Sequence, residues 1–170
     1  AAAKRILPIV DMNVEIKSNE ESENLALREG NIIFNNVNFS YKSNLENKVL
    51  RGVSAEFSGG KMTALVGHSG SGKSTLLNMI PRIYSPIGGS IEIDKQDISK
   101  INLHSLRKEI SIVDQNTTLF DDTVFNNIKY AKPEASMEEV VEAANNAMCK
   151  DFIDNLDNKY ETMIGENGVK

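Results

Sequence analysis

The residues of this sequence best suited to chemistry form one run, Gly67-His68-Ser69-Gly70-Ser71-Gly72-Lys73-Ser74-Thr75. A glycine, four further residues and then Gly-Lys-Ser is the pattern of loops that bind the phosphates of nucleoside triphosphates. Glycines let the backbone curl so that successive N–H groups converge on an anion. Lys73 adds a positive charge for the β- and γ-phosphates, and the Ser74 hydroxyl can coordinate Mg²⁺. The residues predicted to bind the nucleotide are Gly67, Ser69, Gly70, Ser71, Gly72, Lys73, Ser74 and Thr75.

The segments on either side of the loop support this prediction. Residues 62–66 are largely apolar and predict a buried strand leading into the loop, and residues 76–80 predict a helix leading out of it. A flexible Gly/Ser linker is the alternative, but such linkers do not lie between an apolar strand and an apolar helix. His68 occupies a position that the pattern leaves free, so we expect a solvated loop residue without a catalytic role.

The composition is that of an ordinary globular protein. The chain has 170 residues, 40% hydrophobic and 25% charged, which is enough for one domain with a real core. A net charge of −5 argues against a large basic surface for nucleic acid, because binding to a duplex requires clustered Lys and Arg. No apolar run is long enough to span a bilayer. The single cysteine, Cys149, permits no internal disulfide bond and fits a reducing compartment.

Ahead of the loop, the chain divides into a tail, a linker and a β unit. Residues 1–11 are similar to the end of a helix, and residues 13–30 are polar and rich in carboxylates, which predicts an extended linker with solvated charges. Residues 31–41 and 49–57 have the spacing of strands, with a slip at Asn35-Asn36. We expect these two strands to form an antiparallel unit.

After the loop, short strands and helices alternate. Residues 90–94 predict a strand, and residues 110–113 predict another strand in the core. Helices are predicted at Leu103–Lys108, 123–130 and 151–156.

A further helix begins after Ser136, because Ser136 and Glu139 have the spacing of a capping box. Apolar residues recur along it every three or four positions, and we expect this stripe to pack against the core. The stripe consists of Met137, Val140, Val141, Ala144 and Met148.

The order of these features resembles the nucleotide-binding domain of ABC transporters, specifically the exporter type, over essentially the whole chain. Residues 67–75 correspond to the Walker A loop. Tyr41, in Phe39-Ser40-Tyr41, resembles the aromatic residue that stacks on adenine. Gln115, in Val113-Asp114-Gln115-Asn116, lies where the family has its Q-loop glutamine.

Both ends of the chain also fit the resemblance. Residues 2–7 resemble the stretch after an exporter's last membrane helix, and residues 164–168 resemble the x-loop, which touches the coupling helices of the membrane domain. The resemblance implies an α/β fold, a P-loop NTPase core with an N-terminal antiparallel β subdomain. Residues 1–30 would be the membrane-helix tail and linker, and residues 31–170 the N-terminal part of the nucleotide-binding domain.

The resemblance also implies roles for single residues. Tyr41 offers a ring face to adenine. Gln115 offers its amide oxygen to Mg²⁺ or to a nearby water, and it reports the nucleotide state to the membrane domain. Lys73 and Gln115 are the predicted catalytic residues, Ser74 and Gln115 the predicted metal ligands, and ATP and Mg²⁺ the predicted cofactors.

The sequence departs from the family pattern in two places. After the x-loop the family continues with a Leu-Ser-Gly-Gly-Gln signature, a Walker B strand with its Asp and catalytic Glu, a D-loop and a switch His, and none of these is present. We therefore expect an incomplete core that lacks its C-terminal part, binds Mg-ATP weakly and hydrolyses it negligibly. The second departure is Asp94-Lys95, where the family commonly has Asp-Gly, and Lys95 predicts a less strained turn.

Three functions are compatible with these motifs: the ATP-binding part of an exporter, a nucleotide-binding regulatory module without catalysis, and another P-loop enzyme such as a kinase. A kinase would need a lid with arginines, and only Arg82 and Arg107 follow the loop. The exporter function implies a second nucleotide-binding domain and membrane-domain coupling helices as partners, the latter contacted through Gln115 and residues 165–168. It also implies the cytoplasmic face of the inner membrane as the location.

Overall fold

The computed structural model describes residues 22–41, 47–115 and 118–165, which form two compact units dividing between Ser111 and Ile112. The predicted helical tail at residues 1–11 lies outside the described residues. None of the helices in this part of the chain has the length and apolar character of a bilayer-spanning segment. Each unit is described by itself below.

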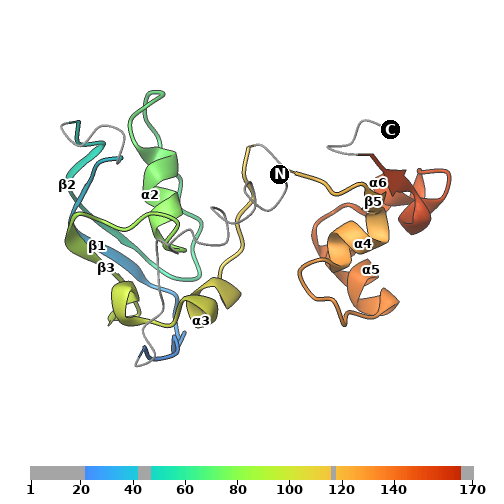
Figure 1. Cartoon of the computed structure of the whole chain (residues 1–170), viewed down its shortest axis with the longest axis horizontal. Helices are drawn as coiled ribbons and strands as arrows, with labels where there is room; N and C mark the ends of the chain where they lie inside the picture. The colour runs from blue at the N-terminus through green and yellow to red at the C-terminus, as the bar shows by residue number, and fades with distance from the viewer. Residues whose placement is uncertain (1–21, 42–46, 116–117, 166–170) are drawn as a thin grey trace, which may run out of the picture. The chain divides into compact units, whose positions relative to one another are not determined.

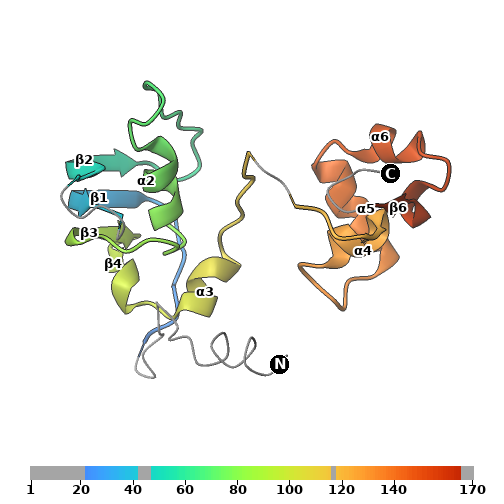
Figure 2. The same ribbon diagram turned by 45° about the horizontal axis from the view of Figure 1, so that its top comes forward.

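A four-stranded antiparallel sheet is the frame of the first unit. Its strands lie in the order β2 (Leu50–Phe57), β1 (Ile32–Phe39), β3 (Gly88–Ile93) and β4 (Gln96–Asp97), as Figure 2 shows. The predicted antiparallel unit ahead of the loop is confirmed. The strand predicted at residues 90–94 is also confirmed, although it begins two residues earlier.

The slip predicted in the first strand is a β-bulge between Phe34 and Val37. Within it, Asn36 has a φ of 50°, in the left-handed region that Asn tolerates better than most residues. An odd spacing would normally send Phe34 and Val37 to opposite faces of a strand. The bulge instead lets both side chains enter the core, where they are 1% and 0% exposed.

Helices cover the sheet and complete the core of the first unit (Figure 1). The segment α2 (Lys73–Met79) begins where the glycines of the loop end, and its Leu76 and Met79 join the sheet residues in the core. After the β3–β4 hairpin come a 3-10 turn, η1 (Ile98–Lys100), and α3 (Leu103–Lys108), whose predicted bounds are confirmed. The buried core consists of Phe34, Val37, Phe39, Leu50, Leu76, Met79, Ile91, Ile93, Ile98, Ile101 and Leu106.

The described part of the predicted linker, residues 22–30, lies against the rest of the first unit. Glu23 forms a parallel β-bridge with Ile101, beside the start of α3. The side chains of Glu23 and Glu29 are exposed, as predicted. The backbone of this segment is therefore bound, whereas its charges face solvent.

Two segments predicted as buried strands are not strands. Met62 and Val66, in the segment before the loop, are 101% and 93% exposed, and Val113, in the segment 110–113, is 93% exposed. A strand is stable only beside a neighbour that takes its N–H and C=O groups. Among the described residues, no strand pairs with either segment. Their apolar character indicated full burial, but within these segments Leu65 and Ile110 are only partly buried against the core, and Met62, Val66 and Val113 are exposed.

The β3–β4 hairpin turns at Asp94 and Lys95, with φ of 49° and 66°. Positive φ at both central residues is typical of the tight turn that suits the twist of a hairpin. The prediction that Lys95 gives a less strained turn is wrong, because a side chain crowds the backbone at positive φ and glycine does not.

Helices around a small core form the second unit. The predicted helices at 123–130, after Ser136 and at 151–156 are confirmed as α4 (Val124–Lys129), α5 (Met137–Asn146) and α6 (Lys150–Asp154). The short strands β5 (Asp122–Thr123) and β6 (Met163–Ile164) pair antiparallel, and the turn η2 (Lys159–Glu161) precedes β6. The buried residues at the centre are Val124, Ala144 and Ile153.

The capping box at the start of α5 is present in full. The Glu139 N–H donates to Ser136 Oγ at 3.3 Å, and the Ser136 N–H donates to Glu139 Oε2 at 2.9 Å. Val140 and Ala144 are buried, as the stripe predicted. The prediction is wrong at Met137, which is 43% exposed in the first turn of α5. It is also wrong at Met148, which is 89% exposed with a φ of 57°, because α5 has ended and the chain has turned.

Candidate nucleotide-binding site

Residues 67–75 form a curved loop that runs into α2, as the pattern predicts. Gly70 and Gly72 have φ of 78° and 91°, in the region that glycine adopts without crowding. A Cβ atom at Gly72 would lie 2.8 Å from Leu50 Cδ2, so a side chain here would require Leu50 to shift, and the positive φ of Gly72 would strain any residue but glycine. Glycine thus lets the end of the loop pass close to β2 where α2 begins.

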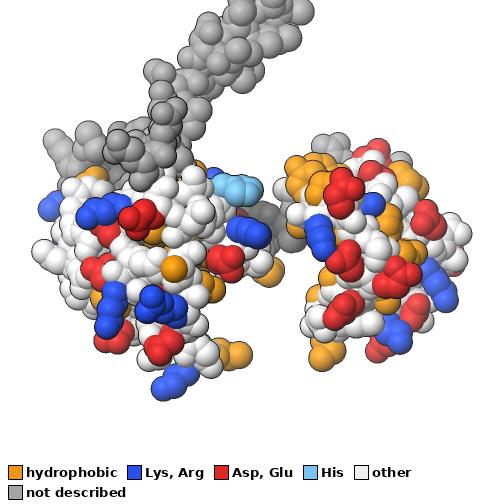
Figure 3. Space-filling model, turned by 90° about the horizontal axis from the view of Figure 1, so that it is seen from below, with side chains coloured by type: hydrophobic (Ala, Val, Ile, Leu, Met, Phe, Trp, Pro, Cys, Tyr) orange, Lys and Arg blue, Asp and Glu red, His pale blue; other side chains and the backbone are white. Residues whose placement is uncertain are grey.

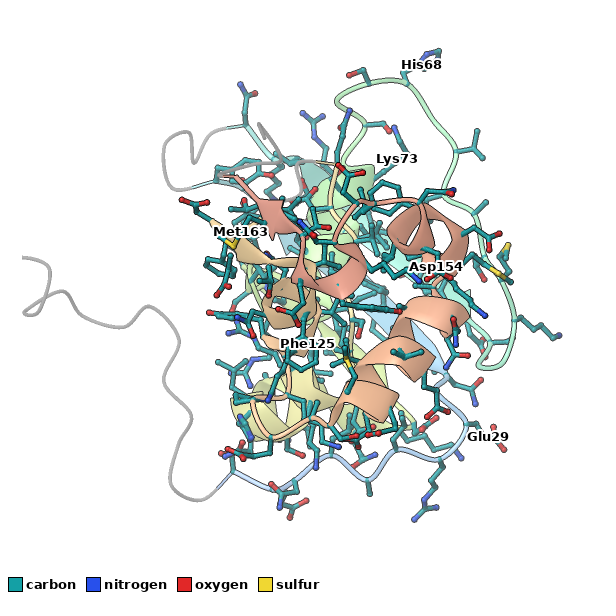
Figure 4. The ribbon with its side chains drawn as sticks, turned by 90° about the vertical axis from the view of Figure 1, so that its right-hand side faces the viewer. Glu29, His68, Lys73, Phe125, Asp154 and Met163 are labelled. Atoms are coloured by element: carbon teal, nitrogen blue, oxygen red, sulfur yellow. The ribbon has the colours of Figure 1, made fainter. Side chains whose placement is uncertain are left out.

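Lys73 lies inside the curve of the loop. Its Nζ donates to the carbonyl oxygen of Gly67 at 2.9 Å, to that of His68 at 2.8 Å and to Ser71 Oγ at 3.3 Å. Figure 4 shows His68 projecting outward from the tip of the loop, where its side chain is exposed as predicted. The loop thus holds one positive charge within its curve, and this charge can attract an anion.

The first turn of α2 combines a hydroxyl oxygen, that of Ser74, with the positive electrostatic potential of a helix start. Unpaired N–H groups give a helix start a partial positive charge, and the first turn of α2 contains no acidic residue that would offset it. Ser74 is exposed, so its hydroxyl is an accessible oxygen of the kind that Mg²⁺ binds. Thr75 is 5% exposed and faces inward.

Tyr41 lies beside the start of α2. Its hydroxyl is 2.8 Å from Thr75 Oγ1. The Tyr41 ring meets the rings of Phe39 and Tyr84 nearly at right angles, with centroid distances of 5.0 and 5.3 Å. Tyr41 is still 37% exposed, so part of the ring remains open to a planar ligand.

A cavity of about 330 Å³ adjoins the loop. Leu50 and Val53 of β2 line one part of it, and Gly67, Gly72 and Lys73 line another. An apolar wall next to a cationic loop has the character of a ligand site, because such sites are mostly apolar with a few convergent polar groups.

Gln115 is not brought to this site by the described structure. It belongs to the second unit, whose position relative to residues 67–75 is not determined, and its backbone N–H donates to Asp114 Oδ1 at 2.7 Å. Of the predicted x-loop, only Ile164 and Gly165 lie within the described residues. The structure therefore brings together Tyr41 and the residues of the loop.

Sequence reasoning missed two partners of the site. Tyr84 follows α2 and supports the Tyr41 ring, and Leu50 closes the space next to Gly72. The aromatic character of Tyr84, shortly after the loop helix, could have indicated its role. Nothing in the sequence near Leu50 indicates a role in the site, because Leu50 is an ordinary strand residue.

Charge is mixed on the surface drawn in Figure 3, where Lys and Arg side chains of the described residues alternate with Asp and Glu. A duplex-binding surface would gather Lys and Arg on one face instead.

Comparisons with known proteins agree with the loop and the fold. A family model described as ABC transporter matches residues 50–168. The chain is 42% identical over 170 residues to an ATP-dependent lipid A-core flippase of Syntrophus aciditrophicus, covering 100% of this chain and 28% of that protein. It is 41% identical over 165 residues to a putative multidrug export ATP-binding/permease protein of Staphylococcus aureus, covering 97% of this chain and 28% of the relative.

A solved structure of a bacterial Atm1-family ABC exporter with ATP bound gives a TM-score of 0.90 at 37% identity, over 98% of this chain and 29% of that chain. The chain spans less than a third of each of these relatives. The match confirms the predicted α/β P-loop fold with its antiparallel β subdomain. Since the family model covers more than half of the sequence, the chain belongs to the ABC transporter family, and its nucleotide-binding domain is of the exporter type.

Proposed function

We propose that this chain binds ATP with Mg²⁺ at residues 67–75, as the ATP-binding part of an exporter that couples ATP binding and hydrolysis to transport across a membrane. The observation that carries the proposal is the position of Lys73 inside the loop, where Nζ donates to two backbone carbonyls. Phosphate oxygens are charged acceptors and bind an ammonium group more strongly than carbonyl oxygens do. The β- and γ-phosphates would therefore take over these donors.

Tyr41 is the proposed partner of adenine. Its ring is held by Phe39 and Tyr84 and tied to Thr75, so little conformational entropy is lost when a base stacks on it. Stacking tolerates any planar base, which makes Tyr41 a source of affinity more than of discrimination between bases.

Ser74 is the proposed Mg²⁺ ligand of the first unit, together with phosphate oxygens. A hydroxyl oxygen at the start of α2 fits a hard cation that prefers oxygen and shares its coordination with substrate phosphates. When bound, Mg²⁺ would neutralise charge between the β- and γ-phosphates. Gln115 is the proposed second metal ligand, from the second unit.

Lys73 and Gln115 are the proposed catalytic residues, Lys73 by stabilising charge on the γ-phosphate and Gln115 by orienting water. The carboxylates that the family uses as Walker B ligand and general base have no counterpart in this sequence. We therefore propose that this chain by itself binds Mg-ATP weakly and hydrolyses it negligibly.

The proposed partners are a second nucleotide-binding domain and the coupling helices of a transmembrane domain, contacted through Gln115 and residues 165–168. The proposed location is the cytoplasmic face of the inner membrane. Relatives named as a flippase and as a multidrug export protein support a membrane-transport setting. A nucleotide-binding regulatory module without catalysis is the alternative function.

Equilibrium titration of the chain with Mg-ATP tests the proposal. We expect saturable binding that Lys73→Ala weakens at least roughly tenfold, because a charge-assisted contact is lost. Lys61→Ala is the matched control, since Lys61 is exposed and lies outside the loop. An affinity that is equal in Lys73→Ala and in the original chain would contradict the proposed site. Robust hydrolysis abolished by Lys73→Ala would contradict the claim of negligible turnover.

A further inference from the structure

Residues 23–31, the segment that leads into β1, are held by side chains of the β3–β4 hairpin and α3, and we call this segment the strap. Four successive backbone N–H groups, those of residues 28–31, donate to the single carboxylate of Asp94. The first three reach Oδ2 at 2.8, 3.1 and 3.0 Å, and the fourth reaches Oδ1 at 2.9 Å. The Asp94 side chain thus takes the backbone N–H groups that would otherwise pair with an adjacent strand.

The first half of the strap is bound in the same manner. The carboxamide of Gln96 accepts from the Ala26 N–H at 2.9 Å and donates back to the Ala26 carbonyl at 2.8 Å. Ser105 Oγ of α3 accepts from the Leu25 N–H at 2.9 Å. Side chains that lie 63 to 80 residues away in the sequence therefore bind most of the strap.

On its other side the strap meets the turn after β2. A Cβ atom at Gly59 would lie 1.6 Å from the Glu29 carbonyl oxygen, so the backbones touch where glycine allows it. The Gly59 N–H also donates to Asn31 Oδ1 at 2.9 Å. The Glu29 side chain itself extends outward, as Figure 4 shows. The strap is confined between this turn and the hairpin.

We propose that Asp94 is the positioning residue of a clasp that makes the strap a rigid extension of the sheet, so that the strap moves as one body with the ATP-binding unit. A free polar linker would absorb a displacement at either end, whereas a segment fixed to the hairpin transmits it. The clasp is a property of the first unit alone. Its use in transmitting motion to a membrane domain rests on the proposed function.

The variant Asp94→Asn separates the clasp from the turn. Asn tolerates a φ of 49° at least as well as Asp, so the hairpin keeps its geometry. The amide, however, replaces one acceptor oxygen by an NH₂ group, which cannot accept from the N–H groups of the strap. Glu92→Gln is the matched control, because Glu92 lies on β3 two residues before Asp94 and its carboxylate accepts from Asn35.

Backbone amide exchange and ¹⁵N relaxation of the 170-residue chain test the clasp. We expect slow exchange and order parameters near 0.85 for residues 28–31, a value typical of rigid backbone. In Asp94→Asn we expect exchange at least roughly tenfold faster and order parameters below about 0.6. Glu92→Gln should match the original chain.

Acid titration of the original chain tests the clasp if Asp94→Asn does not fold. In the original chain, the four amide signals of residues 28–31 should shift together in one acid transition, because they share one carboxylate. A residue that served only to form the turn would not give this common transition. Fast exchange in the original chain, or four unrelated titrations, would overturn the clasp. If the strap amides exchange slowly but the chain does not bind ATP, the clasp is supported and the proposed function is contradicted.

Discussion

The hydroxyl groups of Tyr41 and Thr75 lie 2.8 Å apart, which joins the segment just after β1 to the first turn of α2. Thr75 is 5% exposed and immediately follows the Lys-Ser pair of the loop. The proposed base-stacking ring and the phosphate loop are therefore positioned by the same contact, although 34 residues separate them.

This contact gives a graded prediction for ATP affinity. Tyr41→Phe keeps the ring and removes the hydroxyl, which should weaken Mg-ATP binding about fivefold, since a net hydrogen bond contributes about 1 kcal/mol. Tyr41→Ala also removes the stacking face, worth about 1–3 kcal/mol, and should weaken binding considerably more. Titration with inorganic triphosphate, which has no base, is the control. If Tyr41→Ala weakened ATP and triphosphate equally, Tyr41 would not be the partner of adenine.

Lys95→Gly should stabilise the first unit. The residue has a φ of 66° in the hairpin turn, and the left-handed region costs a residue with a Cβ roughly 1 kcal/mol. The urea midpoint of the sheet amides, followed by hydrogen exchange, should rise accordingly. Lys95→Ala removes the same charge but keeps the Cβ, so it should show no gain. Equal stability of the two variants would mean that the turn is not strained.

Acid should release the strap. Hydrogen bonds from the strap, first of all from the Arg28 N–H, lower the pKa of Asp94 below its ordinary value of 3.8. The folded state favours the carboxylate, so this stabilisation is present above pH 3.8 and is lost as the pH falls through the lower pKa of the folded state. Exchange of the strap amides, corrected for intrinsic rates, should accelerate in that window, and Asp94→Asn should remove the acceleration.

Other charged groups near Asp94 provide the controls for this pH profile. Arg28, Glu29, Glu56 and Lys95 line the same hollow. Glu29→Gln and Glu56→Gln remove the neighbouring carboxylates and should leave the transition in place. A transition that disappears in either of these variants would assign it to another carboxylate.

Ser136→Ala should destabilise α5 by about 1 kcal/mol, because the hydroxyl satisfies a backbone N–H at the start of the helix. The exchange rates of the Val140 and Ala144 amides report this change within the second unit. Ser136→Asp, which also caps helices well, should restore protection. Unchanged rates in Ser136→Ala would show that core packing alone holds the helix.

Local signals allowed several elements to be predicted from the sequence. Asn102 accepts from the N–H groups of His104 and Ser105, and the helix Leu103–Lys108 follows with the predicted bounds. The capping box at Ser136 and the glycines of residues 67–75 are equally local. In each case the residues that determine the conformation lie within a few positions of one another.

Features that depend on distant partners were not predictable in the same way. Residues 62–66 have the apolar character of a buried strand, but burial also needs a neighbouring surface. The clasp joins Asp94 to residues 28–31, and the sequence around neither of them predicts this contact. The positive φ of Lys95 follows from the hairpin geometry, not from the preference of lysine.

The shifts of backbone amide signals on titration with Mg-ATP test the central claim most directly. If the loop is the ATP site, the largest shifts fall on residues 67–75 and on Tyr41, they saturate together, and Lys73→Ala abolishes them. Shifts that cluster elsewhere in the chain, or that persist unchanged in Lys73→Ala, would contradict the assignment of the loop as the ATP site.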